Sequence, residues 1–404
     1  MHILVLSQYF WPESFRINAF AESLRRAGAD VTVLTGQPNY PDGKVFAGYT
    51  AASIRREVFA SDIDVFRVPI VPRGHGSAVR LAINYMSFVL SAAMIGPWSL
   101  RGRKIDVVFV YAPSPIVQVI PAVFLSWLKR ARLVTWVQDL WPESLTSTGF
   151  VSNRVLLALV DQLVRWIYRR NDLLLGQSQA FVAAMVPKAS HTRVEYFPNP
   201  GEGAALRVEP HGRAALELPA GFNVVFAGNL GTVQSLDTIL DAADLLRDHK
   251  GLRLILIGSG SRSTWLQDEV TRRRLDNVMI PGRFPSSMMP AIFAQASALL
   301  VSLSRSEILS QTIPAKMQTY LAAGRPIIAS LDGEGANLIV AAEAGLVAPA
   351  EDSVGLADCL TRLQGMSEAE RERMGSAARI FYEQHFQSDL LAERLVATFR
   401  GLLT

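Results

Sequence analysis

The chain has 404 residues, half of them hydrophobic, with a net charge of +4 and one cysteine, Cys359. This length exceeds one ordinary core, so two domains are expected, and a single cysteine excludes an internal disulfide framework and suits a reducing cytoplasm. The positive charge lies in patches near residues 101–104, 129–132 and 165–170, which we interpret as solvated helix ends; an anionic lipid or a nucleic acid is the alternative.

The first quarter of the chain opens a Rossmann-like half. His2–Ser7 is rich in Ile, Leu and Val, as expected for a parallel strand that is buried on both faces. The aromatic and charged loop Gln8–Arg16 follows it, at the place where ligands meet such a sheet. After a helix and the strand Ala29–Leu34, the Pro/Gly-rich loop Thr35–Tyr49 carries further aromatic residues, which favours a binding loop.

The segment Leu81–Leu100 is the most apolar stretch of the chain. It is broken by Asn84, several serines and Gly96-Pro97, so it falls short of the roughly 20 clean apolar residues of a transmembrane span. The pattern instead predicts a helix near 78–100 that lies in or against an apolar environment. The N-terminus shows no secretory signal.

Two acidic residues follow the strand Leu133–Val137. Asp139 and Glu143 flank Trp141-Pro142 in the segment Gln138–Ser144. Trp141-Pro142 could simply pack and turn the chain, but two acids at the carboxyl end of a strand are poorly placed for a core. We therefore interpret the segment as functional.

The weakly patterned stretch Glu202–Gly221 predicts an interdomain linker, after which the alternation of strands, loops and helices begins again. Glycine turns follow two successive strands, at Gly228–Gly231 and at Gly258–Gly260. Two such turns at strand ends indicate a phosphate site. Ile313–Ile339 adds a helix, a tight turn, a strand and then Gly333-Glu334-Gly335, and the helical tail Ser367–Leu403 is expected to return toward the first domain.

These patterns together predict an α/β fold of two Rossmann-like domains that face a central cleft, with a C-terminal helix crossing back. The expected domains are 1–205, 206–375 and the helix 376–404. Binding and catalysis would share the cleft.

The chain resembles the GT-B-fold glycosyltransferases of family 4, in the bacterial O-antigen, colanic-acid and capsule branch of the WbuB/WcaI type. The motifs that carry the resemblance are Tyr9–Asn18, Thr35–Lys44, Tyr111–Pro115, Val137–Ser144, Phe226–Gly231 and Ile313–Ile339.

The resemblance implies retaining transfer of a sugar from a nucleotide diphosphate donor, UDP-linked, without a metal or other cofactor; an N-acetylated deoxyhexosamine is one candidate sugar. It implies a polyprenyl-diphosphate-linked saccharide as acceptor at the inner face of the cytoplasmic membrane, with the helix near 78–100 as the docking surface, and no nucleic acid partner. The protein would be cytoplasmic and peripherally membrane-associated, with the acceptor in the N-terminal domain and the nucleotide in the C-terminal one.

The expected site residues follow from these motifs. Asp139 is expected to orient or deprotonate the acceptor hydroxyl, with Glu13 and Glu143 as lesser candidates. The expected acceptor-binding residues are Tyr9, Trp11, Arg16, Asn39, Tyr40 and Trp141. The expected donor-binding residues are Gly228, Asn229, Gly231, Gly258, Gly260, Arg283, Gln311, Lys316, Thr319, Glu334 and Gly335.

The chain departs from the family pattern at three places. Gln311 and Thr319 stand where the family usually has two glutamates, so ribose recognition would need another residue, for which Gln318 is a candidate. Gln234 stands where a basic residue often follows the first glycine loop. The diphosphate charge would then be met by loop amides, Arg283 and Lys316.

Two other functions remain open on the sequence. One is a nucleotide-sugar epimerase of the same two-domain fold, although the six histidines form no paired motif. The other is a non-catalytic scaffold of a polysaccharide assembly complex, which the missing glutamates allow and which the aromatic loops and Asp139 argue against.

Overall fold

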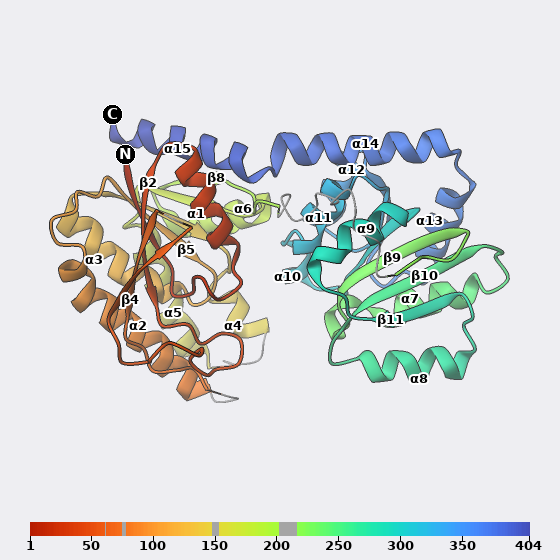
Figure 1. The fold of residues 1–404 in the computed structure, drawn as a ribbon, viewed down its shortest axis with the longest axis horizontal. Helices are drawn as coiled ribbons and strands as arrows, with labels where there is room; N and C mark the ends of the chain where they lie inside the picture. Colours follow the sequence, from red (N-terminus) through yellow and green to blue (C-terminus); the bar gives the residue numbers. More distant parts are fainter. Residues whose placement is uncertain (61, 75–77, 148–152, 202–215) are drawn as a thin grey trace. The chain divides into compact units, whose positions relative to one another are not determined.

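The computed structural model describes residues 1–60, 62–74, 78–147, 153–201 and 216–404 (Figure 1). The chain divides into two compact units. The first comprises Met1–Pro200 and Ser388–Thr404, and the second comprises Gly201–Gln387. Most of the predicted linker, 202–215, lies outside the described residues.

The first unit is built on an eight-stranded sheet in the order β3-β4-β2-β1-β5-β6-β7-β8. All neighbouring pairs are parallel except β3 and β4. The central strands are buried on both faces, which explains their runs of Val, Ile and Leu. The strands are β1 (His2–Leu6), β2 (Asp30–Gly36), β3 (Arg55–Phe59), β4 (Ile63–Val68), β5 (Val107–Ala112), β6 (Arg132–Val137), β7 (Leu173–Gly176) and β8 (Arg193–Tyr196).

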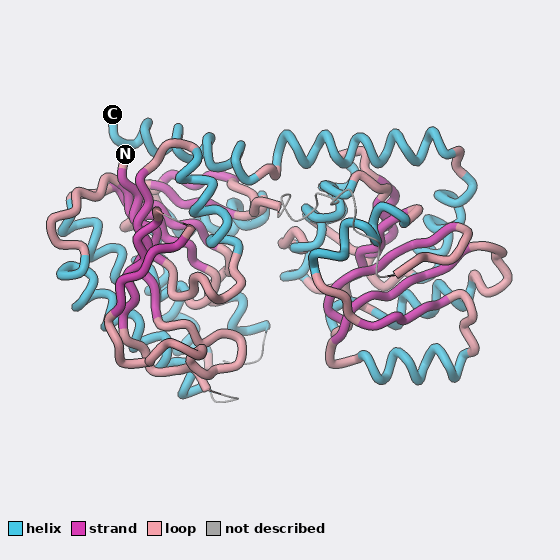
Figure 2. Tube along the Cα trace, in the orientation of Figure 1, coloured by secondary structure: helices cyan, strands magenta, loops and turns pink. Residues whose placement is uncertain are grey.

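Helices cover both faces of this sheet (Figure 2). One face packs against α1 and α15, where Phe20 and Leu24 lie in one buried cluster with Leu395 and Phe399. The other face packs mainly against α2, α3, α5 and α6. The helices are α1 (Arg16–Arg26), α2 (Ala78–Ser99), α3 (Val119–Lys129), α4 (Glu143–Ser147), α5 (Arg154–Tyr168), α6 (Gln179–Ala189) and α15 (Ser388–Leu403).

The second unit is a six-stranded, all-parallel sheet in the order β11-β10-β9-β12-β13-β14, again with helices on both faces. Its strands are β9 (Phe222–Asn229), β10 (Leu252–Ser259), β11 (Val278–Gly282), β12 (Ala298–Ser302), β13 (Ile327–Ser330) and β14 (Gly345–Ala348). Its helices are α7 (Leu236–Leu245), α8 (Ser263–Arg273), α9 (Met289–Gln295), α10 (Glu307–Ser310), α11 (Ala315–Ala323), α12 (Glu334–Ala341), α13 (Ser353–Gly365) and α14 (Glu368–His385).

Both units are therefore Rossmann-like, and the chain leaves the second unit at Gln387 to place its last helix, α15, on the first. The helical tail is two helices, α14 and α15, rather than one. The sequence did not single out the strands β3, β8 and β14. All three lie at sheet edges and are only partly buried, so they lack the continuous apolar run of a central strand.

Candidate active site

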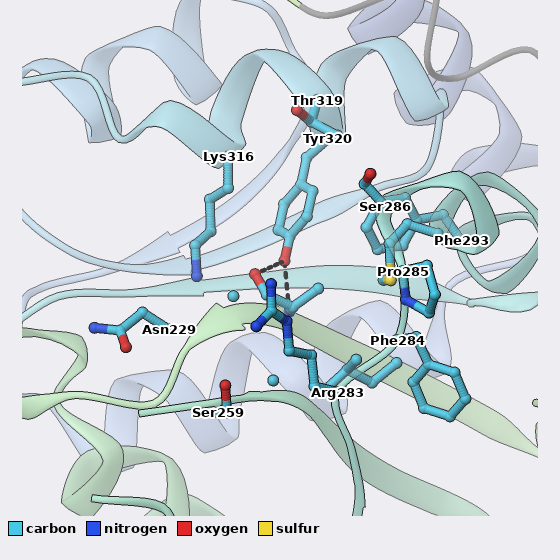
Figure 3. A pocket seen from close by; sticks show the side chains of 15 residues that line it. Asn229, Ser259, Arg283, Phe284, Pro285, Ser286, Phe293, Lys316, Thr319 and Tyr320 are labelled. Carbon is cyan, nitrogen blue, oxygen red and sulfur yellow. Dashed lines mark hydrogen bonds between the residues drawn. The ribbon is translucent and has the colours of Figure 1, made fainter. Parts of the chain in front are cut away.

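The second unit contains a cavity of about 500 Å³ at the carboxyl ends of β9, β10 and β11, which we call the β9–β11 cavity (Figure 3). In a parallel sheet this edge collects the loops that follow the strands, so ligands bind there. Helices α9 and α11 supply the remaining wall. The lining residues are Ala227, Gly228, Asn229, Ile257, Gly258, Ser259, Arg283, Phe284, Pro285, Ser286, Met289, Phe293, Lys316, Thr319 and Tyr320.

Two paired glycines allow the ends of β9 and β10 to approach each other. Gly228 and Gly258 are register partners with φ of +146° and +148°. A Cβ on Gly258 would lie 1.8 Å from the carbonyl oxygen of Gly228, well inside van der Waals contact. The glycine turns predicted from the sequence thus have a steric cause here, because no side chain fits at this point.

Tyr320 fixes the end of β9 from α11. Its hydroxyl accepts a hydrogen bond from the Ala227 amide at 2.8 Å and donates to the Ala227 carbonyl at 3.3 Å (Figure 3). The side chain is 1% exposed, so these backbone groups have little access to water. Tyr320 therefore holds Ala227 and the glycine turn after it in place.

Lys316 lies one turn before Tyr320 on α11 and extends to the same strand end (Figure 3). Its Nζ is buried, 3.6 Å from the ring centroid of Phe226, and a Cβ on Gly228 would be 3.0 Å from it. The ammonium has no hydrogen-bond partner among the described residues. Burial lowers the pKa of Lys316 to about 7, because the charged form loses its hydration.

Arg283 follows β11 directly and stands on the rim of the cavity (Figure 3). No ion-pair partner for Arg283 occurs within the described ranges. In the same part of the chain, none of the residues that line the cavity is an Asp or a Glu. The described lining thus carries two basic side chains and no compensating acid, which suits an anionic ligand.

The structure brings together six of the predicted donor-binding residues: Gly228, Asn229, Gly258, Arg283, Lys316 and Thr319. The other five do not line the cavity. Gly231 and Gly260 lie in the turns just beyond the two strands, Gln311 follows α10, and Glu334 and Gly335 begin α12. Their predicted roles stay predictions.

Gln318, the candidate substitute for ribose recognition, and Gln234, which stands where a basic residue often occurs, both point elsewhere. Gln318 is 1% exposed and its Cβ lies beside Gly201, away from the cavity lining. The Gln234 side chain accepts a hydrogen bond from the Gly231 amide at 3.1 Å and closes the turn locally. The sequence missed Ser259, Tyr320 and the segment Phe284–Phe293 as lining. Only Tyr320 carried a signal, since it lies four residues after Lys316 on one helix face.

In the first unit, Asp139 lies just after β6, next to the end of β5. Its Oδ2 accepts a hydrogen bond from Trp141 Nε1 at 3.2 Å, and the same Nε1 is 3.3 Å from Ser114 Oγ. Burial raises the pKa of Asp139, while hydrogen bonds from Ser114, Trp141 and Ser144 oppose this rise. Asp139 is therefore a partly desolvated carboxyl at a strand end, and hydrogen bonds fix its position.

The two lesser acid candidates are both engaged. Glu143 forms an ion pair with Lys188 at 2.6 Å. Glu13 is 1% exposed, and its carboxylate accepts from the amides of Asn39, Tyr40 and Phe10 at 2.8, 2.7 and 3.2 Å. Burial raises the pKa of Glu13 to about 7 against these three bonds. These contacts give Glu13 a structural task, which is to join two aromatic loops.

The loops that Glu13 joins carry the predicted acceptor-binding aromatics. Tyr9 stacks on Phe15 with 5.1 Å between ring centroids, and Tyr40 packs against both rings. Tyr9 is buried, whereas Trp11 and Tyr40 are exposed at 40% and 38%. Asn39 is buried and accepts from the Arg73 amide at 3.0 Å.

Two further predicted residues lie at neighbouring strand ends. Arg16 begins α1. Burial raises the pKa of Tyr111, at the end of β5, to about 12, and the positive charge of Arg16 opposes this rise. Trp141 follows β6 and contacts Asp139 and Ser114. No group of three or more His, Cys, Asp or Glu side chains in the described ranges is placed to hold a metal ion.

Two family models together match most of the chain. The model described as "Glycosyl transferase 4-like domain" matches residues 14–200, and that described as "Glycosyl transferases group 1" matches 221–365. The putative colanic acid biosynthesis glycosyl transferase WcaI of Escherichia coli is 26% identical over 346 residues, which is 80% of this chain and 82% of that protein. The probable glycosyltransferase WbjE of Pseudomonas aeruginosa is 24% identical over 361 residues, 85% of both chains.

The chain is a family 4 glycosyltransferase. It belongs to the branch related to colanic-acid and O-antigen enzymes, as the sequence motifs predicted.

The fold of this glycosyltransferase is GT-B, which confirms the predicted fold class. Sucrose-phosphate synthase of Thermosynechococcus elongatus matches it with a TM-score of 0.70 at 15% identity, over 99% of this chain and 98% of that one. The Anabaena protein HepE, in complex with UDP, matches with a TM-score of 0.68 at 14% identity, over 99% and 100%. The family assignment replaces the epimerase and scaffold alternatives.

Proposed function

We propose that this glycosyltransferase binds a UDP-linked sugar in the β9–β11 cavity and transfers the sugar, with retention of configuration, to a polyprenyl-diphosphate-linked saccharide. The product would enter bacterial surface polysaccharide. The observation that carries the donor assignment is the charge of the cavity, where Lys316 and Arg283 meet no acid of the lining. A nucleotide diphosphate supplies the missing negative charge.

The same two cations supply the chemistry that leaving-group departure needs. As the bond from the sugar to the diphosphate breaks, negative charge builds on the diphosphate, and cations that are already in place stabilise that charge. The glycine turn at Gly228 lets backbone approach the phosphates because no Cβ intervenes. We propose that the leaving group needs no metal ion, since the two side chains can meet its charge.

On the acceptor side we propose that Asp139 orients or deprotonates the attacking hydroxyl. Its raised pKa brings it closer to the range in which a general base accepts a proton effectively. Tyr9, Trp11, Arg16, Asn39, Tyr40 and Trp141 would bind the acceptor. The structural contacts of Glu13 and Glu143 make Asp139 the first residue to test.

We further propose that the first unit docks on the inner face of the cytoplasmic membrane through α2. Among the described helices, α2 is the one that is long and apolar enough to cross a membrane by length and composition. Its large apolar side chains at 79, 83, 86, 90, 94 and 98 are all at least 46% exposed. A surface of this kind suits shallow insertion at the interface.

A panel of nucleotide sugars tests the donor assignment. The cognate UDP-sugar should raise the melting temperature of the protein, since a ligand that binds only the folded state stabilises it. Transfer to a diphosphate-linked acceptor should then release UDP in the presence of EDTA, and the NMR spectrum of the product should show the donor's anomeric configuration. Asp139→Asn should abolish transfer and keep donor binding.

Stabilisation by GDP-sugars alone would overturn the UDP assignment. Loss of transfer on chelation, or an inverted product, would overturn the metal-free retaining mechanism. Full transfer by Asp139→Asn would remove Asp139 from it.

A further inference from the structure

Arg73 is a basic side chain of the first unit that the function above does not use. Its guanidinium lies over the face of the Tyr40 ring, 5.1 Å from the centroid, and its Nη1 donates to the Tyr9 hydroxyl at 3.4 Å. No carboxylate pairs with Arg73 in the part of the chain that the structure describes. Arg73 is half-buried, and its guanidinium has five N–H donors, so those that do not contact Tyr9 have capacity for an anion.

The position of Arg73 is fixed by a buried hydrogen-bond network. Its amide donates to Asn39 Oδ1 at 3.0 Å, and the amide of Asn39 is held in turn by Glu13 at 2.8 Å. Asn84 of α2 donates to the Val71 carbonyl at 2.6 Å and accepts from Gln8 Nε2 at 2.8 Å. These side chains are buried, so the network holds the segment 71–73 in one place.

Hydroxyl donors stand beside the guanidinium. Tyr9 and Tyr85 are hydrogen-bonded to each other, and Arg73 acts electrostatically on both, while Asp139 acts on Tyr85. The guanidinium and the two phenols are therefore adjacent, and the charge of the proposed catalytic carboxyl, Asp139, acts on the nearer side of this group at Tyr85. An anion bound at Arg73 would lie close to the acceptor chemistry.

The same segment borders the apolar surface of α2. Val71 is 41% exposed, and its amide donates a hydrogen bond to Ser87 Oγ of α2 at 2.9 Å. Arg80 of α2 donates to the Pro72 carbonyl at 3.4 Å. The exposed side chains of α2 begin at Val79 and continue along one stripe to Trp98. One ligand could thus place an anionic group at Arg73 and extend a long apolar chain along α2.

We infer that Arg73, with the Tyr9 and Tyr85 hydroxyls, binds the diphosphate of the lipid carrier, and that the exposed stripe of α2 receives the first isoprene units. This inference rests on the proposed acceptor class and adds the residue that recognises the carrier. Arginine suits this task because its planar fork donates two parallel hydrogen bonds to phosphate oxygens. Arg73 is then a specificity-determining residue, since a saccharide without the diphosphate lacks the anionic oxygens that the guanidinium would bind.

The test measures binding of farnesyl diphosphate by calorimetry in the presence of saturating UDP, which keeps the probe out of the β9–β11 cavity. Arg73→Gln should weaken binding at least tenfold. The matched control Arg101→Gln, an exposed arginine just after the other end of α2, should leave binding unchanged. Farnesol and inorganic pyrophosphate separate the two parts of the ligand: each should bind more weakly than farnesyl diphosphate, and only pyrophosphate should respond to Arg73→Gln.

Equal binding of farnesyl diphosphate by wild type and Arg73→Gln would overturn the inference, as would an equal loss for farnesol, which would mean a general structural defect. Tight binding of pyrophosphate alone, with no gain from the farnesyl chain, would overturn the role of α2. The outcome does not depend on transfer. A chain that binds farnesyl diphosphate through Arg73 but transfers no sugar refutes the proposed function and leaves the diphosphate site standing.

Discussion

Replacement of Lys316 by Met tests the donor cavity most directly, because it keeps the apolar stem and removes the charge. The Nζ is buried against Phe226 without a partner, so a bound diphosphate would be its first ionic contact among the described residues. A hydrogen bond between charged groups contributes about 1.5–3 kcal/mol. At pH 6, where the amine is already protonated, Lys316→Met should therefore weaken UDP-sugar binding by about 10- to 150-fold.

The pH dependence follows from the pKa of about 7 that burial gives Lys316. The diphosphate stabilises the charged amine and raises this pKa in the complex, so binding takes up a proton wherever the free amine is neutral. At pH 8 protonating the amine costs about 1.4 kcal/mol. Wild-type affinity should thus fall about tenfold between pH 6 and pH 8, whereas the affinity of Lys316→Met should stay nearly flat.

Calorimetry in two buffers with different ionisation enthalpies measures the proton uptake itself. The wild type should take up about 0.9 proton per UDP-sugar at pH 8, and Lys316→Met should take up none. Lys250→Met is the matched control, since Lys250 is exposed beyond the opposite end of β10. No uptake by the wild type, or the same uptake by Lys316→Met, would refute the assignment of Lys316 to the diphosphate.

Three further predictions follow from the packing. Gly258→Ala should destabilise the second unit by several kcal/mol in urea unfolding, because its Cβ would meet the Gly228 carbonyl oxygen at 1.8 Å. Gly251 also has a positive φ but faces open space, so Gly251→Ala should cost only about 1 kcal/mol. Equal losses of stability in the two variants would contradict the steric argument. Tyr320→Phe should cost about 1–3 kcal/mol by leaving the Ala227 amide without its hydroxyl partner, and an unchanged urea midpoint would count against it. The folded-state pKa of Glu13, about 7, lies above the unfolded value, so its contribution to stability is present at low pH and is lost as pH rises toward 7. The melting temperature of Glu13→Gln should therefore rise relative to that of the wild type between pH 5 and pH 8. A constant difference between the two melting temperatures over this range would contradict the prediction.

Much of the β9–β11 cavity could be predicted from the sequence. The apolar runs of β9 and β10 and the glycines after them placed two strand ends and two tight turns, and the structure adds the steric reason at Gly258. Lys316 was found because it lies on a short helix near these turns, and Thr319 because it stands where the family usually has a glutamate. Local patterns were sufficient for the strands, the turns and Lys316, since strand, turn and helix are each specified over a few neighbouring residues.

The direction of individual side chains could not be read from the sequence. Gln318 and Lys316 are two residues apart on α11, yet Lys316 enters the cavity and Gln318 is buried beside Gly201. Glu13 looked like a catalytic acid because it follows a strand, but its carboxylate is occupied by amides from a loop 26 residues away. These outcomes depend on what packs against each face, which spacing along the chain does not reveal.

What the sequence determined by itself was the family, the alternation of strands and helices, and the glycine turns at the ends of β9 and β10. Tertiary structure alone decided that Lys316 lies over Phe226 with no hydrogen-bond partner among the described residues, and that Tyr320 holds the end of β9. It also decided that Arg73 lies between Tyr9 and Tyr40, near the start of the apolar stripe of α2. The physical reason is that hydrogen bonding and desolvation depend on neighbours distant in sequence, whereas backbone conformation depends largely on near ones.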